Sequence, residues 1–148
     1  MEMTLYEVLK NKGSDVHVIG PEATLDEAIR AMTHKNVGSL LVCMRDVDRG
    51  EEVVGILSER DVLRFCAADR GPPSTARVSD VMTRNVLTAA PTEPVQSVLG
   101  HMTRSRVRHM PVVSSGRLVG IVSIGDLVKA QLDRLSMENQ FMKDYISG

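Results

Sequence analysis

The sequence predicts a mixed α/β (α+β) fold built from two copies of one β-α-β-β-α unit. A repeated motif is the first observation: residues 55–61 read Gly-Ile-Leu-Ser-Glu-Arg-Asp, and residues 120–126 read Gly-Ile-Val-Ser-Ile-Gly-Asp. The second is that residues 37–42 align with residues 107–112 at an offset of 70. Internal repetition of this kind fixes the architecture before single residues are interpreted. The length of 148 residues fits one compact domain, whereas half of it would be marginal alone, so we expect the copies to support each other.

The boundaries of the repeats follow from breaks in the alignment. Between Val42 and Gly55 the first copy has five extra residues within the polar stretch 45–52, which we expect in a surface loop. Consecutive prolines at Pro72 and Pro73 cannot lie inside a helix or a central strand and indicate a linker. The predicted organisation is a first repeat over residues 1–70, a linker over 71–78, a second repeat over 79–130 and a C-terminal helical extension over 131–148.

The elements of the first copy can be assigned in order. An amphipathic segment over residues 5–12 precedes Gly13 and predicts a helix with a left-handed glycine at its end. Residues 15–19 alternate apolar and polar side chains and predict a short strand. The capping-box spacing of Thr24 predicts a helix over residues 25–35. The remaining elements expected are strands at residues 39–43 and 53–57 and a helix at residues 59–68.

The second copy repeats this order and then continues. We expect a strand at residues 86–88, a helix at 95–104, strands at 111–114 and 118–122, and a helix that starts near Ile124. The tail from residue 129 carries further apolar side chains at helical spacing. It predicts one or two helical turns beyond the repeat, covering either the paired unit or a dimer partner.

Composition excludes several classes of function. The formal net charge is −1 with scattered basic residues, so neither nucleic acid nor a membrane surface is an expected partner. No apolar run is long enough to span a membrane or to form a signal core, and we expect a cytoplasmic protein. Cys43 and Cys66 form no CxxC pattern and are predicted to be buried free thiols. The spacing of His17, His34 and His101 predicts no metal site.

The repeated Gly-x-x-Ser-x-x-Asp motif has two interpretations. In the structural one, Ser58 and Ser123 cap helices, while Asp61 and Asp126 are first-turn acids that favour the helix dipole. In the functional one, a helix N-terminus at the end of a strand binds an anion, and the nearby carboxylate accepts hydrogen bonds from two vicinal hydroxyls. A ligand with both phosphate and ribose would satisfy this arrangement.

Three further features carry a family resemblance: residues 80–83 read Asp-Val-Met-Thr, residues 107–113 read Val-Arg-His-Met-Pro-Val-Val, and the Ser-x-x-Asp motif occurs twice. The ordered set, over about residues 5–130, resembles a tandem cystathionine β-synthase (CBS) domain pair, or Bateman module. It looks most like stand-alone bacterial CBS-pair proteins assigned to signal transduction. The resemblance implies small sheets, helices at an inter-repeat interface, a pseudo-twofold axis and a homodimer. It also implies AMP, ADP, ATP or NAD bound in clefts between the repeats.

The same resemblance implies roles for particular residues. Asp61 and Asp126 would hold ribose hydroxyls, and adenine would lie against residues 15–18 and 83–88. The copies differ in their cations, because Gly125 replaces Arg60 and residues 108–109 are Arg-His where residues 38–39 are Gly-Ser. Which cleft binds is therefore open. The candidate nucleotide-binding residues are Asp15, Val16, Val18, Gly38, Ser39, Leu40, Ser58, Arg60, Asp61, Thr83, Val86, Thr88, Arg108, His109, Met110, Pro111, Ser123 and Asp126.

These observations are compatible with three functions. The favoured one is a non-catalytic adenine-nucleotide sensor that changes conformation or dimer packing and acts on an unknown effector protein. An enzyme is disfavoured, since no nucleophile with an adjacent base, no Walker loop and no GxGxxG motif is found. The alternative is a structural or protein-interaction module with vestigial clefts that regulates a thiol-redox partner.

Overall fold

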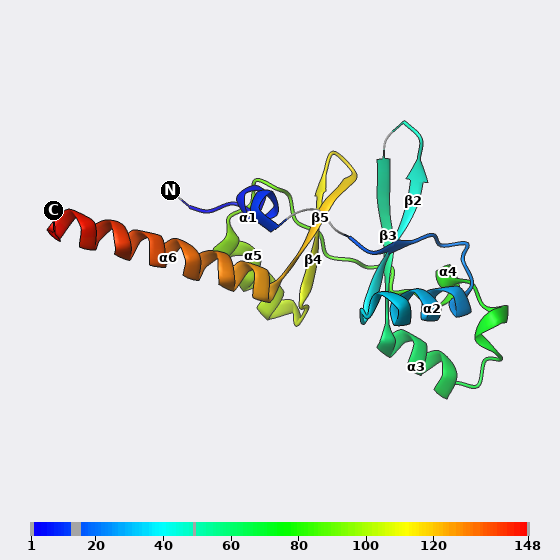
Figure 1. The fold of residues 1–148 in the computed structure, drawn as a ribbon. Helices are drawn as coiled ribbons and strands as arrows, with labels where there is room; N and C mark the ends of the chain where they lie inside the picture. Colours follow the sequence, from blue (N-terminus) through cyan, green and yellow to red (C-terminus); the bar gives the residue numbers. More distant parts are fainter. Residues whose placement is uncertain (1, 13–15, 49, 148) are drawn as a thin grey trace. The chain divides into compact units, whose positions relative to one another are not determined.

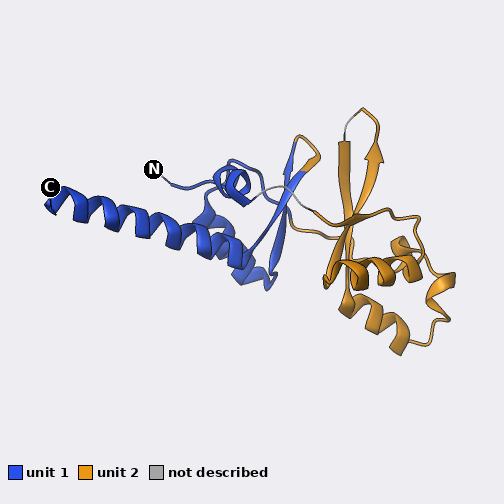
Figure 2. Ribbon diagram, viewed as in Figure 1, with its two compact units in different colours: residues 1–14, 88–114, 119–148 blue, residues 15–87, 115–118 orange. Residues whose placement is uncertain are grey.

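The computed structural model describes residues 2–12, 16–48 and 50–147, and it divides into two compact units (Figure 2). Unit 1 comprises residues 1–14, 88–114 and 119–148, and unit 2 comprises residues 15–87 and 115–118. The units therefore do not follow the halves of the sequence, because the N-terminal segment belongs to the unit that contains most of the second repeat. The division into repeats at residues 70 and 79 remains a prediction about the sequence alone.

Unit 2 is a three-stranded sheet with helices (Figure 1). The strand order is β1-β2-β3, with β1 parallel to β2 and β2 antiparallel to β3. Its elements are β1 (Val18–Ile19), α2 (Leu25–Lys35), β2 (Ser39–Asp46), β3 (Gly50–Ser58), α3 (Glu59–Ala67), the 3-10 helix η1 (Pro73–Thr75) and α4 (Val78–Val81). The N–H of Glu27 donates to Oγ1 of Thr24 at 3.1 Å, which confirms the predicted start of α2.

The hairpin of β2 and β3 is longer than the sequence predicts. Arg45 pairs with Glu51 and Asp46 with Gly50, so most of the five-residue insertion continues the antiparallel ladder. A bulge between Val42 and Cys43 absorbs a shift in register. In contrast, β1 is limited to two residues. Asp15, the predicted start of this strand, and Gly13, the predicted end of the first helix, lie outside the described residues.

The core of unit 2 lies between the sheet and its helices. Leu25, Ala28 and Met32 project from one face of α2 onto buried residues of β2 and β3. The short helix α4 completes this core, because Val78 is fully buried and Met82 nearly so. A Cβ on Gly55 would lie 2.5 Å from Sδ of Met82. Glycine thus allows the chain after α4 to lie directly against β3.

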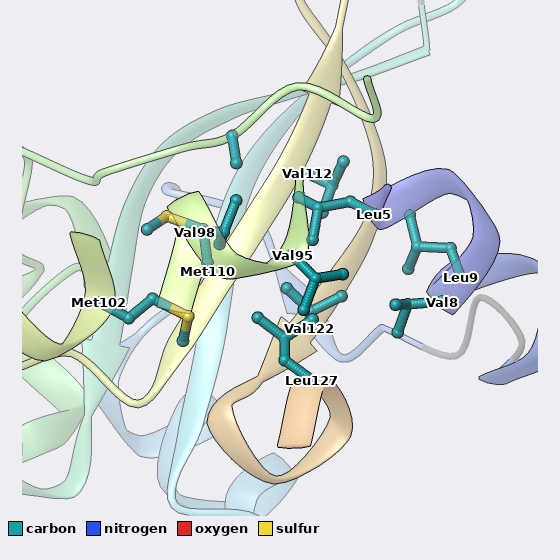
Figure 3. Packing of buried hydrophobic residues seen from close by; sticks show 11 residues of the cluster. Leu5, Val8, Leu9, Val95, Val98, Met102, Met110, Val112, Val122 and Leu127 are labelled. Atoms are coloured by element: carbon teal, nitrogen blue, oxygen red, sulfur yellow. The ribbon is translucent and has the colours of Figure 1, made fainter. Parts of the chain in front are cut away.

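Unit 1 contains a two-stranded sheet and three helices (Figure 1). Its elements are α1 (Leu5–Lys12), α5 (Val95–Ser105), β4 (His109–Ser114), β5 (Arg117–Ser123) and α6 (Ile124–Ser147). Figure 3 shows buried side chains from all five elements converging on one core, with Leu5, Val8 and Leu9 supplied by α1. Without α1, this core would lack three of its apolar side chains, and the residues that they cover would be exposed to solvent.

Two expectations for the second part of the chain differ from the structure: one strand is absent, and the expected C-terminal helix is present but longer than predicted. The strand predicted at residues 86–88 is absent; a single parallel bridge joins Ala89 to Val112 instead. Pro111 has no N–H to donate to a neighbouring strand, which limits the ladder at this edge. The predicted one or two extra turns are a continuous 24-residue helix, α6, because no glycine or proline interrupts the chain between Gly125 and Gly148.

The cysteines match the prediction only in part. Both are free, but Cys43 is buried whereas Cys66 is exposed. Burial, with a smaller contribution from the charge of Glu51, raises the pKa of Cys43 to about 11, so this thiol stays protonated at neutral pH. Within residues 2–12, 16–48 and 50–147, no helix has the length and apolar character needed to cross a membrane.

Candidate functional site

Both copies of the Ser-x-x-Asp motif form the same helix start. In unit 2, the N–H of Ser58 donates to Oδ2 of Asp61 at 2.9 Å, and the N–H of Asp61 donates to Oγ of Ser58 at 3.2 Å. In unit 1, the N–H of Ser123 donates to Oδ2 of Asp126 at 2.8 Å, and the N–H of Asp126 donates to Oγ of Ser123 at 3.0 Å. This reciprocal arrangement is a capping box, which confirms the structural interpretation of the motif. It engages one carboxylate oxygen of each aspartate and leaves the other for a further role.

In unit 2 the second oxygen of the aspartate is also engaged. The hydroxyl of Thr83 donates to Oδ1 of Asp61 at 3.3 Å, and Asp61 is only 8% exposed. The N–H of Glu59 donates to the carbonyl of Gly38 at 3.0 Å. The carboxyl group of Glu59 also lies beside Gly38, because a Cβ added to this glycine would be within 4 Å of it. The neighbourhood of Asp61 is therefore closed and, on the side of Gly38, acidic. The predicted cation, Arg60, is exposed.

In unit 1 the aspartate is paired with a lysine that sequence reasoning missed. Nζ of Lys12, the last residue of α1, donates to Oδ2 of Asp126 at 2.6 Å and to the carbonyl of Ile121 at 2.7 Å. Among the described residues no hydrogen bond reaches Oδ1 of Asp126, and its side chain is 27% exposed. Burial raises the pKa of Asp126, but the hydrogen bonds from Lys12 and Ser123 outweigh it and hold that pKa below its ordinary value.

Further charged groups surround Asp126. The N–H of Ile124 donates to the carbonyl of Arg108 at 3.0 Å, which ties the start of β4 to the start of α6. Partial desolvation lowers the pKa of His109; the positive charges of Lys12 and Arg108 lower it further, and the Asp126 carboxylate offsets only part of this shift. His109 is therefore neutral at physiological pH. The cluster contains two basic side chains, one imidazole and one carboxylate.

A cavity of about 590 Å³ lies beside this cluster, between α1 and α6 of unit 1. Its volume is within the range of small-molecule sites. Lys12 and Asp126 belong to its wall together with apolar side chains such as Val8 and Met137. Its other lining residues are Met3, Glu7, Asn11, Lys129, Ala130, Asp133 and Arg134.

The structure brings some of the predicted site residues together and buries the side chains of others, where a ligand cannot reach them. Gly38, Ser39, Ser58, Asp61 and Thr83 meet in unit 2, and Arg108, His109, Ser123 and Asp126 meet in unit 1. Leu40, Met110 and Pro111 are buried, so only their main-chain atoms could meet a ligand. Val16, Val18 and Val86 are half-buried, Thr88 is exposed, and Asp15 lies outside the described residues.

A signal for Lys12 was present in the sequence. At the offset of 70 that relates the copies, Lys12 aligns with Met82, which precedes Thr83. The structure places the two in corresponding positions: Met82 and Thr83 contact β3 near Asp61, and Lys12 contacts β5 near Asp126. Extending the alignment backward by one element would have predicted a cation beside Asp126.

Comparison with known proteins identifies the family. A family model described as the CBS domain matches residues 3–68 and 78–133. The chain belongs to the CBS domain family, and it contains the CBS domain pair that its repeated sequence predicts. CBS domain pairs are regulatory modules that often bind adenosine ligands.

Individual relatives agree with this assignment. The mitochondrial CBS domain-containing protein CBSX3 of Arabidopsis thaliana is 34% identical over 98% of this chain and 72% of its own length. The crystal structure of the CBS domain protein NE2398 is 36% identical, with a TM-score of 0.76 over 89% of this chain and 99% of that one. The CBS domain pair of MJ0100, solved with 5′-methylthioadenosine and S-adenosyl-L-methionine, has a TM-score of 0.71 over 90% and 99% of the two chains. At 24% identity, this last likeness shows the fold alone.

Proposed function

We propose that the protein is a non-catalytic regulatory module that binds an adenine nucleotide, AMP, ADP, ATP or NAD, through the cluster around Asp126 in unit 1. The observation that carries the proposal is a carboxylate with one unengaged oxygen, Oδ1 of Asp126, whose other oxygen accepts a hydrogen bond from Nζ of Lys12. Arg108 supplies a second basic side chain on the segment whose carbonyl bonds to the first residue of α6. Vicinal ribose hydroxyls need such an acceptor, and phosphates need such cations.

The roles of the residues follow from this chemistry. Oδ1 of Asp126 accepts from ribose hydroxyls, while Oδ2 stays in the capping box with Ser123. Lys12 and Arg108 supply positive charge to the phosphates. His109, being neutral, contributes a hydrogen bond rather than a charge at physiological pH.

Unit 2 is the weaker candidate for a ligand site. Both oxygens of Asp61 are already engaged, and binding a ribose there would require the hydrogen bond from Thr83 to break. The carboxyl group of Glu59 beside Gly38 would also repel phosphate. These contacts favour a purely structural role for Ser58 and Asp61.

The signalling output belongs to the same proposal. Ligand binding would change conformation or dimer packing of a homodimer and so act on an effector protein. A module with vestigial clefts that regulates a thiol-redox partner is the second candidate; it is favoured only by the exposed thiol of Cys66. The cytoplasmic location stays a prediction from the sequence.

Calorimetric titration with AMP, ATP and NAD tests the proposal. Asp126→Asn, which can retain the cap at Ser123, should weaken binding about ten- to a hundredfold, since a hydrogen bond to a charged group contributes about 1.5–3 kcal/mol. Asp61→Asn should change affinity little, and Asp26→Asn, in the first turn of α2, is the matched control. Unchanged affinity in Asp126→Asn, or a larger loss in Asp61→Asn, would contradict the assignment to unit 1. The absence of binding by the unmodified protein would favour the vestigial module.

A further inference from the structure

Helix α6 exposes a stripe of apolar side chains that repeats at alternating intervals of four and three residues. The apolar members are well exposed, from 41% for Val128 to 77% for Ile146. Intervals of four and three place side chains on one side of a helix, in the pattern of a heptad repeat. This seam consists of Val128, Leu132, Leu135, Asn139, Met142 and Ile146.

The seam lies beside the face with which α6 packs in its own unit, and at its border Leu135 lines a pocket with Met3 and Val95. Leu127 is fully buried in the core of unit 1, and Ile124 and Ala130 pack against that core. The side chains of the seam do not belong to that cluster. The match to the CBS domain ends at residue 133, so the last four seam positions also lie beyond the family model.

We propose that α6 forms a parallel, two-stranded coiled coil with α6 of a second copy of this chain. In heptad terms, Leu132, Asn139 and Ile146 occupy a positions, and Val128, Leu135 and Met142 occupy d positions. A single asparagine at an a position is characteristic of parallel dimers, because two asparagines hydrogen-bond across the interface only when the helices are in register. In any other register, Asn139 would face an apolar side chain without a partner.

Charge complementarity favours the same arrangement. Glu138 precedes an a position and Lys143 follows a d position, the g and e places of a heptad. In a parallel dimer, the g residue of one helix lies near the e residue of the next heptad on its partner, so Glu138 would pair with Lys143 of the second copy. Antiparallel helices would bring e positions together and set Lys129 against Lys143. Within its own helix, Oε1 of Glu138 lies 3.7 Å from Nε of Arg134. The Glu138 side chain is exposed, so it can interact with Lys143 of the second copy as well.

A second copy also fits the seam better than a lipid surface does. The sequence of α6 contains Asp126, Asp133, Glu138 and Asp144 against Lys129, Arg134 and Lys143, a difference of −1. An interfacial helix typically has a polar face rich in lysine and arginine, which this one lacks. The inference takes up the homodimer proposed above and names its surface, but it does not depend on nucleotide binding.

Disulfide cross-linking of the full chain tests the proposal directly. Leu132→Cys and Ile146→Cys are introduced separately into a Cys66→Ser background and oxidised under mild conditions. Both should give covalent dimers, since identical seam positions face each other along a parallel pair. The two positions are about 21 Å apart along the helix, so an antiparallel pair could cross-link at most one of them. Phe141→Cys, which is on α6 but outside the seam, is the control and should remain uncross-linked.

Sedimentation equilibrium with charge reversal supplies the second measurement. Glu138→Lys should weaken the dimer about three- to tenfold, and Glu138→Lys with Lys143→Glu should recover most of that loss. A monomer in solution, a dimer that cross-links at neither seam position, or a dimer that cross-links through Phe141→Cys would each overturn the coiled coil. Nucleotide titration of the same preparations separates this outcome from failure of the proposed function, because either result can occur without the other.

Discussion

Asp61 and Asp126 are equivalent in the sequence but differ in what their second oxygen can do. Both cap their own helix through Oδ2. Thr83 then donates to the remaining oxygen of Asp61, whereas Lys12 shares the capped oxygen of Asp126 and leaves the other open. The difference in hydrogen bonding between the copies thus arises from residues outside the motif. An unpaired carboxylate oxygen beside cations is suited to ligand binding, and a fully bonded buried one is suited to structure.

The Lys12–Asp126 ion pair should make stability depend on pH. Because the pKa of Asp126 is lowered in the folded state, its stabilising effect is complete above the ordinary aspartate pKa of about 4 and is lost as the pH falls through the lower folded value. Lys12→Met should cost about 0.5–1.5 kcal/mol at pH 7 and progressively less below about pH 4. Urea unfolding at a series of pH values measures this difference.

The matched control for this ion pair is Lys10→Met. Lys10 lies on the same helix and is exposed, and no ion pair joins it to another described residue. It should have little effect at any pH. A loss in Lys12→Met that stays constant down to pH 2, or that grows in acid, would show that Lys12 acts through packing of its aliphatic chain rather than through Asp126.

At the scale of elements, the glycine of each repeated motif allows a segment from elsewhere in the chain to lie directly against a strand. A Cβ on Gly55 would be 2.9 Å from the carbonyl oxygen of Thr83, whose chain is held by two hydrogen bonds to Ile56. A Cβ on Gly120 would be 2.7 Å from Cδ2 of Leu9. The first obstacle is main chain, and the second is the end of a flexible side chain.

These surroundings predict different costs for the same substitution. Gly55→Ala should destabilise the protein by about 1–3 kcal/mol, since the Thr83 carbonyl cannot move away without shifting the main chain, even if the Met82 side chain changes rotamer. Gly120→Ala should cost less, because Leu9 can change rotamer. Gly20→Ala, where a Cβ meets nothing within 4 Å, is the control. Chemical denaturation of the three variants ranks them; equal losses at Gly55 and Gly120 would contradict the argument.

Elements that local sequence determines were predicted well. Helix α2 has its cap at Thr24, and the start of α6 at Ile124 follows from the Ser-x-x-Asp motif. The missing strand at residues 86–88 and the length of the β2–β3 hairpin depend on pairing between distant segments, which a local pattern does not contain. The role of Lys12 has the same cause, because α1 contributes to a unit whose other parts begin at residue 88.

At the scale of the whole molecule, neither half of the sequence contains a complete core. Helix α4, which begins at the last residue of the predicted linker, packs in unit 2. The N–H of Val78 donates to the carbonyl of Ala23 at 2.8 Å, and the N–H of Leu25 donates to the carbonyl of Ala76 at 2.9 Å. Helix α1 at the other end of the chain packs in unit 1. Each unit therefore depends on a segment that the repeat alignment assigns to the other copy.

This exchange predicts that residues 1–70 do not fold alone, whereas residues 15–87 do. The first fragment lacks Ala76, Val78 and Met82, which are at most 9% exposed in the intact core, and it retains α1 without the core that α1 covers. Burying a large apolar side chain contributes about 1.5–3 kcal/mol, so losing Val78 and Met82 removes an amount comparable to the whole stability of a domain this small. Residues 15–87 keep these side chains and nearly all of unit 2. Circular dichroism during urea unfolding should show a cooperative transition for residues 15–87 and none for residues 1–70, and a cooperative transition for residues 1–70 would mean that α4 is dispensable.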